Sequence, residues 1–256
     1  MKSKTGLKGR LSECMRIAVE NQEAAGLSLL ILRKGEPVCS LQEGMADLAA
    51  GVKIREDSIF RLYSQTKPIT AAAVMMLAER GVIDLMASVD QYLPGFAHPK
   101  MMDADGNEQV LPRAPWIIEL LSMTSGLCYP DVDPAGQRTA TVFEEAHRRI
   151  QAGEGMTTAE LCNRLGEQPL AFAPGTHWRY GTSAYVLGAV IEAASGKRFS
   201  QFLQEELFEP LGMKDTAFWV PDPKQEMHRV LIKRGPGNRG PTECGTTHEA
   251  TSGMSS

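Results

Sequence analysis

Ser64 and Lys67 are the two residues of this sequence whose types and spacing best fit covalent chemistry. A serine hydroxyl is a weak nucleophile that needs a base beside it, and an amine three positions further on can reach it from the same turn of chain. No other serine among the 256 residues is followed by a lysine at this spacing. The pair therefore predicts a serine nucleophile with a proton acceptor at its side.

The residues after this pair predict a helix that would position it. Residues 68–80 are rich in helix-forming side chains, Pro68 suits a first helical position, and Gly81 is placed as a C-terminal stop. Lys67 can act as a base only if burial or neighbouring positive charge lowers its proton affinity. The positive end of the helix would favour the oxyanion that forms when Ser64 attacks an acyl group.

Serine and lysine are common residues, so about one such spacing is expected by chance in a chain of this length. Ser64 and Lys67 would then be ordinary surface residues. Three further segments argue for a site, and they are Leu120–Leu127, Phe172–Tyr180 and Glu209–Thr216. With the Ser-x-x-Lys motif they resemble, in order, the serine β-lactamase and penicillin-binding-protein superfamily, in its class C β-lactamase-like branch. The resemblance runs from about Leu11 to about Gln225, with Met123 where a histidine is usual.

The resemblance implies that Tyr180 is the catalytic tyrosine of that group. A phenol beside a lysine ammonium is more easily ionised, and its phenolate could carry the serine proton. The alternative is a half-buried core aromatic. The resemblance also makes Thr182 and Ser125 candidate substrate-binding residues. Because Thr182 stands where class C β-lactamases usually carry asparagine, it favours an esterase, such as a family VIII carboxylesterase, over a β-lactamase.

The predicted fold class is α/β (α+β), with an antiparallel sheet flanked by helices and a mostly helical lobe. Apolar runs predict strands over residues 27–32 and 38–45, joined by a turn at residues 34–37. Helices are expected over residues 7–23, 116–123 and 184–195, and a capping box at Thr157 opens another. Residues 85–172 are expected to form the helical lobe, and the acidic turn at residues 103–107 a solvated hairpin rather than a calcium loop.

The end of the sequence changes in composition. Of the 23 residues from Arg234 to Ser256, 14 are Gly, Pro, Ser or Thr, which predicts a disordered tail. The Lys-Thr-Gly element that the resemblance implies is found only at Lys4–Gly6, in the wrong order, and Lys233–Gly235 follows Tyr180 too closely. We therefore expect an incomplete β-lactamase-related domain over residues 1–233 that lacks the C-terminal strands of the sheet, and an aberrant tail over residues 234–256.

Composition limits the possible partners. The chain is 43% hydrophobic and 23% charged with a net charge of −4, so nothing favours nucleic acid or an anionic membrane. No signal peptide or spanning segment is evident. Five cysteines without a close pair, and histidines without ligand spacing, argue against disulfides and a zinc site. We expect a cytoplasmic protein without a metal or cofactor, whose oligomeric state the sequence leaves open.

Two functional hypotheses remain at this stage. The first is a serine hydrolase in which Ser64 forms an acyl-enzyme with a small-molecule ester or amide, while Lys67 and Tyr180 handle its proton. The second is a catalytically impaired, truncated remnant or a non-enzymatic binding protein. The convergence of Ser64, Lys67 and Tyr180 in space would favour the first hypothesis.

Overall fold

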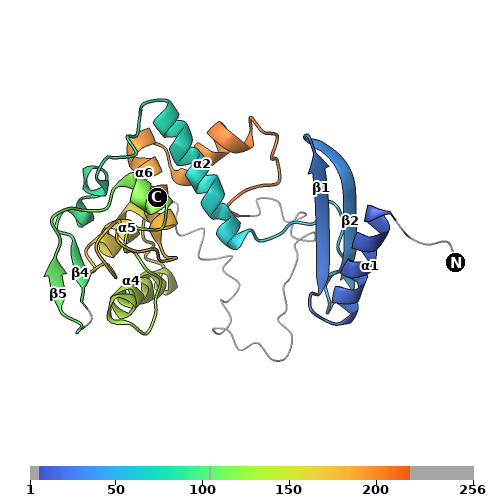
Figure 1. Cartoon of the computed structure of the whole chain (residues 1–256), viewed down its shortest axis with the longest axis horizontal. Coiled ribbons are helices and arrows are strands. Elements are labelled where there is room, and N and C mark those ends of the chain that lie inside the picture. Colours follow the sequence, from blue (N-terminus) through green and yellow to red (C-terminus); the bar gives the residue numbers. More distant parts are fainter. Residues whose placement is uncertain (1–5, 104, 220–256) are drawn as a thin grey trace. The chain divides into compact units, whose positions relative to one another are not determined.

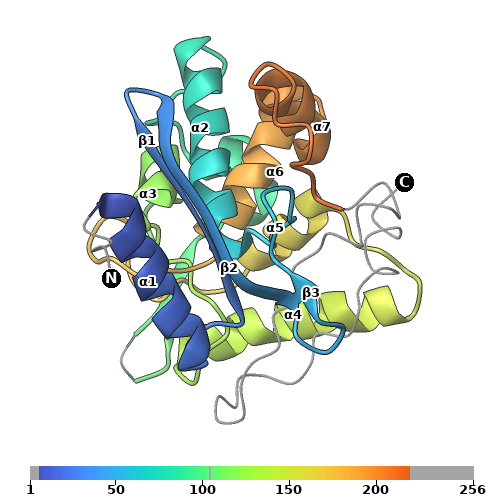
Figure 2. The same ribbon diagram turned by 90° about the vertical axis from the view of Figure 1, so that its right-hand side faces the viewer.

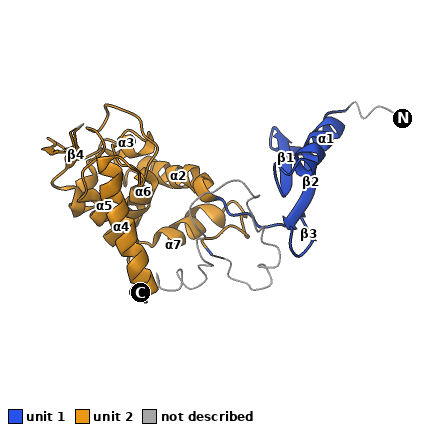
Figure 3. Cartoon of the chain, turned by 90° about the horizontal axis from the view of Figure 1, so that it is seen from below, with its two compact units in different colours: residues 1–62, 219–244 blue, residues 63–218, 245–256 orange. Residues whose placement is uncertain are grey.

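The computed structural model describes residues 6–103 and 105–219. Within these residues the chain divides into two compact units, residues 6–62 with Trp219 and residues 63–218 (Figure 3). The Ser-x-x-Lys motif lies at the start of the second unit. The predicted tail from Arg234 onward lies outside the described residues.

The first unit is a small antiparallel sheet with one helix against it. Its elements are α1 (Leu7–Glu20), β1 (Gly26–Arg33), β2 (Glu36–Asp47) and β3 (Val52–Lys53), and the strands follow the order β1-β2-β3. Lys34 and Gly35 both have positive φ, which matches the twist of a two-residue hairpin turn. Helix α1 packs on this hairpin (Figures 1 and 2). The helix and strand predictions for this unit are thus correct to within a few residues at each end.

The second unit is mostly helical. Its longer elements are α2 (Thr66–Glu79), β4 (Lys100–Met102), β5 (Glu108–Val110), α3 (Ile117–Leu121), α4 (Pro134–Gln151), α5 (Thr158–Gly166), α6 (Ser183–Ser195) and α7 (Phe199–Leu203). Short helical turns are η1 (Tyr63–Gln65), η2 (Val89–Gln91), η3 (Pro94–Phe96) and the π-helical η4 (Gln204–Phe208). Strands β4 and β5 enclose the acidic turn, which is a hairpin as predicted.

Helix α6 forms the centre of this unit. It contacts α2, α3, α5 and α7, and its side chains Val186, Leu187, Val190 and Ile191 are almost completely buried. A helix that is apolar on nearly all sides is stable only inside a core. Gly196 ends it in the left-handed conformation, as the sequence predicted. Because α2 and α6 share one core, the unit extends beyond the lobe of residues 85–172 that we expected.

Helix α4 is the longest helix of the described chain and was not predicted. Asp133 caps it by accepting a hydrogen bond from the Gly136 N–H, Pro134 occupies its first position, and two arginines lie in its last turn. Its buried residues are mostly small, and they lie on one face of a clearly amphipathic helix.

Candidate active site

Ser64 lies in the η1 turn directly before α2, and Lys67 lies in the first turn of that helix. The helix begins at Thr66, two residues earlier than expected, and Pro68 still falls among the first positions that need no intrahelical N–H partner. The Lys67 Nζ donates to the Ser64 Oγ at 3.1 Å. The spacing of three residues therefore places amine and hydroxyl in contact, and the positive end of α2 faces the same place.

Tyr180 reaches this pair from a distant part of the chain. Its hydroxyl donates to the Ser64 Oγ at 2.6 Å, and its ring centroid lies 4.7 Å from the Lys67 Nζ. Ser64 is exposed and Tyr180 is 43% exposed. The structure thus brings together the three residues that the sequence proposed as catalytic, with the hydroxyl of Ser64 open to an incoming molecule.

A second tyrosine, Tyr129, contacts the same lysine and was missed by the sequence analysis. The Lys67 Nζ donates to its hydroxyl at 3.0 Å, and the rings of Tyr129 and Tyr180 lie 5.8 Å apart between centroids. The lysine is therefore held between two phenols. The available signal was an aromatic residue two positions after the Leu120–Leu127 segment, which the sequence analysis had already singled out.

The protonation states of the site follow from these contacts. Burial lowers the pKa of Lys67, but hydrogen bonds to Tyr180 and Tyr129 outweigh it, so that the pKa is raised. The hydrogen bond from Lys67, together with the bond to Ser64 and the charge of the ammonium, lowers the pKa of Tyr180. Lys67 is accordingly a charged donor. The condition set for it as a base, a lowered proton affinity, is not met, and Tyr180 is the group whose ionised form is favoured.

Thr182 and Ser125 lie inside the unit rather than on the site's surface. Thr182 is completely buried and its Oγ1 donates to the Cys128 carbonyl oxygen at 3.3 Å. Ser125 is 1% exposed and its Oγ shares a hydrogen bond of 2.9 Å with the Ser183 Oγ. Both hydroxyls tie the chain before Tyr129 to the start of α6. The prediction that they bind substrate has no support in this arrangement.

The loop that carries Tyr180 is fixed at several points. The Gly175 N–H donates to the Thr124 carbonyl oxygen at 2.8 Å, and the Arg179 N–H donates to that of Met123 at 3.0 Å. Arg113 donates to both carboxylate oxygens of Glu119 and to the Pro174 carbonyl oxygen. The segment from Pro174 to Tyr180 is therefore held along its length, which sets where the phenol points.

A family model described as Beta-lactamase matches residues 11–253 of this chain. The chain belongs to the Beta-lactamase family. The resemblance drawn from the four motifs of the sequence is thereby confirmed.

Members of this family with known names are similar over most of the chain. It is 35% identical over 224 residues to Esterase EstB of Burkholderia gladioli, a match that covers 86% of the chain and 53% of that esterase. It is 26% identical over 214 residues to Lovastatin esterase of Penicillium rubens, covering 81% of the chain and 51% of that protein. The chain spans about half the length of these curated relatives.

Solved structures support the fold. EstCE1, described as a hydrolase with promiscuous acyltransferase activity, matches with a TM-score of 0.70 at 27% identity, covering 86% of the chain and 55% of EstCE1. The predicted mixed α/β class of the β-lactamase type is confirmed by this match. In the described residues, no helix is both long and apolar enough to cross a membrane.

Proposed function

We propose that this protein is a serine hydrolase that cleaves esters of small molecules through an acyl-enzyme on Ser64. The contact of the Ser64 hydroxyl with both Lys67 and Tyr180 is the observation that carries the proposal. The names of its relatives, Esterase EstB and Lovastatin esterase, favour esters over β-lactams. Small amides are the slower substrates expected from the same chemistry.

Tyr180 is the general base in this proposal. As a phenolate it takes the proton of the Ser64 hydroxyl while Oγ attacks the ester carbonyl carbon, and the tetrahedral intermediate carries the negative charge on the former carbonyl oxygen. The bond to the alcohol oxygen then breaks, and Tyr180 gives its proton to the leaving alcohol. Water attacks the acyl-enzyme with the same base, which releases the acid and restores Ser64.

Lys67 acts as an electrostatic partner and is not itself the base in this scheme. Its ammonium favours the phenolate of Tyr180, and the raised pKa of Lys67 favours its charged form. Tyr129 accepts a hydrogen bond from the same Nζ and thereby holds the charge beside Ser64. The backbone N–H of Ser64 at the start of α2 is proposed as one oxyanion donor.

Covalent labelling of the 256-residue chain tests this proposal. An alkyl fluorophosphonate should modify Ser64, which peptide mass spectrometry would locate, and p-nitrophenyl butyrate should be hydrolysed faster than nitrocefin. Ser64→Ala should abolish both the labelling and the hydrolysis. Ser122→Ala is the matched control, because Ser122 is an exposed serine of the same unit whose Oγ is bonded to the Ile118 carbonyl oxygen.

The proposal fails if a folded chain is not labelled, or if label appears on a serine other than Ser64. Circular dichroism of each variant establishes that the chain is folded. A folded chain without labelling would support the competing hypothesis of an impaired remnant or a binding protein.

A further inference from the structure

Tyr129 and Tyr180 belong to different segments of the second unit. The proposed role of each tyrosine requires that its side chain lies beside Lys67. Tyr129 follows the buried stretch Ser125–Cys128, whereas Tyr180 ends the loop that begins at Pro174. A phenol can take the Ser64 proton only if it stays within hydrogen-bond reach of Oγ. Contacts between the two segments must therefore hold both tyrosines beside Lys67.

Backbone contacts hold the two segments together on their buried side. Gly181 lies so close to the Leu127 carbonyl oxygen that a Cβ at this position would come within 2.1 Å of it. The Thr182 Oγ1 donates to the neighbouring Cys128 carbonyl oxygen, and the Arg179 N–H donates to Met123. These contacts hold the backbone of residues 179–182 against residues 123–128.

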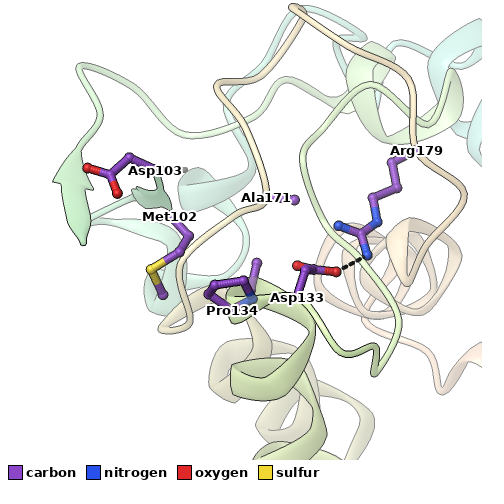
Figure 4. A pocket seen from close by; sticks show the side chains of 7 residues that line it. Met102, Asp103, Asp133, Pro134, Ala171 and Arg179 are labelled. Atoms are coloured by element: carbon purple, nitrogen blue, oxygen red, sulfur yellow. Dashed lines mark hydrogen bonds and ion pairs between the residues drawn. The ribbon is translucent and has the colours of Figure 1, made fainter. Parts of the chain in front are cut away.

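The Arg179 side chain supplies a second attachment point, directly before Tyr180. Its Nη2 donates to Asp131 at 3.1 Å and to Asp133 at 2.5 Å, two and four residues beyond Tyr129. Figure 4 shows the bond to Asp133. The ion pair lowers the pKa of Asp133 and raises that of Arg179. One guanidinium therefore links the segment of each tyrosine to that of the other.

Asp133, the carboxylate of this ion pair, is held in place by the start of α4. Asp133 is the N-cap of the 18-residue helix α4, where its Oδ1 accepts from the Gly136 N–H at 3.1 Å. Gly136 lies against the backbone of Asp131, so close that a Cβ there would approach the Asp131 nitrogen to 2.6 Å. The turn from Asp131 to Gly136 is thus tightly packed, and a group bonded to it is held by the whole helix.

We propose that Arg179 and Asp133 are a positioning pair that keeps the Tyr180 phenol in place against Ser64 and Lys67. The proposal rests on the proposed function, since it concerns the same base. An ordinary surface ion pair contributes about 0–1 kcal/mol to stability and would leave the site unchanged when removed. The pair differs from such a bridge because it is half-buried and joins the segments that carry Tyr129 and Tyr180. Its carboxylate is also the N-cap of α4.

Asp133→Asn is the sharpest variant, because asparagine caps a helix as well as aspartate but carries no charge. Arg179→Gln removes the same ion pair from the other side and leaves the α4 cap intact, so each variant checks the other if one fails to fold. Glu145→Gln is the matched control. Glu145 also lies on α4 and pairs with Arg164 at 3.2 Å, with a side-chain exposure of 29% against 34% for Asp133.

Two readouts separate positioning from stability. The first is the rate of acylation by a p-nitrophenyl ester near neutral pH, for which we expect a loss of about tenfold or more in Asp133→Asn and Arg179→Gln. The second is the phenolate absorbance of Tyr180, obtained by subtracting the titration of a Tyr180→Phe chain. The titration midpoint should move up toward the ordinary tyrosine value of about 10 in both variants. None of these variants alters Lys67, Tyr129 or Tyr185, which lie near Tyr180.

The double variant Arg179→Gln/Asp133→Asn should lose no more than Arg179→Gln alone, because Arg179→Gln already removes the bond to Asp133 together with the bond to Asp131. Glu145→Gln should leave rate and titration unchanged. An unaltered rate and titration in folded Asp133→Asn or Arg179→Gln would overturn the positioning role. If the wild-type chain is not acylated but Asp133→Asn still shifts the titration of Tyr180, the proposed function is refuted. The positioning role of Arg179 and Asp133 would then still be supported.

Discussion

The Tyr180 hydroxyl lies 2.6 Å from the Ser64 Oγ although 116 residues separate the two in sequence. The Lys67 Nζ bonds the same Oγ at 3.1 Å and lies over the Tyr180 ring. A serine that accepts from both a phenol and an ammonium has its proton acceptor and a stabilising charge in place before a substrate arrives. This arrangement yields separate expectations for each of the three groups around Ser64.

Tyr180→Phe should lower kcat/KM for p-nitrophenyl esters by roughly 10²–10³, the usual contribution of a positioned general base. The ring and its packing on Tyr129 are retained, so the loss reports the hydroxyl alone. Tyr185→Phe is the control, because the Tyr185 ring meets the Tyr129 ring edge-on at 6.5 Å between centroids and its hydroxyl has no described bond to Ser64 or Lys67. Equal losses in both variants would mean that the aromatic packing, rather than the Tyr180 hydroxyl, supports the reaction.

The pH dependence of acylation distinguishes Tyr180 from Lys67 as the base. A base acts when it is deprotonated, so the rate rises with pH through the pKa of that base. The lowered pKa of Tyr180 places this rise below the ordinary value of about 10, whereas the raised pKa of Lys67 would place it above 10.5.

Lys67→Met should shift the pH dependence of acylation in the opposite direction, to higher pH. Without the ammonium the pKa of Tyr180 should return toward its ordinary value, and the rise in rate should move to higher pH together with a lower maximal rate. Pre-steady-state acylation of wild type and variant across the alkaline range measures both. A rise that moves to lower pH in Lys67→Met would contradict the electrostatic role of this residue.

Tyr129→Phe should reduce the acylation rate less than Tyr180→Phe does. The variant removes the acceptor of one Lys67 hydrogen bond, and the net value of a bond to a charged group, about 1.5 kcal/mol, corresponds to roughly tenfold in rate. The double variant Lys67→Met/Tyr129→Phe should match Lys67→Met, because Tyr129 acts through the lysine. Full additivity of the two losses would indicate that Tyr129 contacts the substrate instead.

The contact of Ser64 with Lys67 was predictable from a local spacing, whereas the approach of Tyr180 was implied by the family resemblance of its segment. A spacing of three residues at a helix start places two side chains together wherever the helix lies, and the Pro-Gly turn before Tyr180 marks a recognisable segment. Tyr129 could not be found this way, since its contact with Lys67 depends on how the loop after Cys128 folds back over α2. The burial of Thr182 and Ser125 likewise follows from the packing of α6, which no spacing in the sequence discloses.

The same distinction applies to the fold. The Lys34-Gly35 turn, the Thr157 cap and Gly196 after α6 are short-range signals, and each marks an element boundary found in the structure. Helix α4 has a clear start at Asp133-Pro134, but its buried positions are mostly small residues such as Ala135 and Ala146. The polar and apolar residues of this helix are nonetheless well separated, so both its N-terminal signal and its helical period were present in the sequence and were overlooked.

Glu119→Gln should destabilise the second unit. Glu119 is 6% exposed, and its carboxylate accepts two bonds from Arg113 and one from the Trp116 N–H. Removing one charge of a buried pair leaves the other uncompensated, and because Arg113 is one-third exposed we expect a loss of about 2–3 kcal/mol in unfolding free energy. For a unit of this size that corresponds to a fall in Tm of roughly 5 °C or more.

Glu205→Gln is the control for this loss, because Glu205 pairs with Lys197 on the surface of the same unit at 2.8 Å, and Glu206 remains as a second partner. Thermal and urea unfolding of both variants, followed by circular dichroism, should show a lower Tm for Glu119→Gln and no change for Glu205→Gln. Arg113 also donates to the Pro174 carbonyl oxygen at the start of the Tyr180 loop, so the Glu119 variant should lose acylation rate at temperatures well below its Tm. A Glu119→Gln chain as stable as wild type would show that the Arg113 guanidinium finds adequate solvation without its partner.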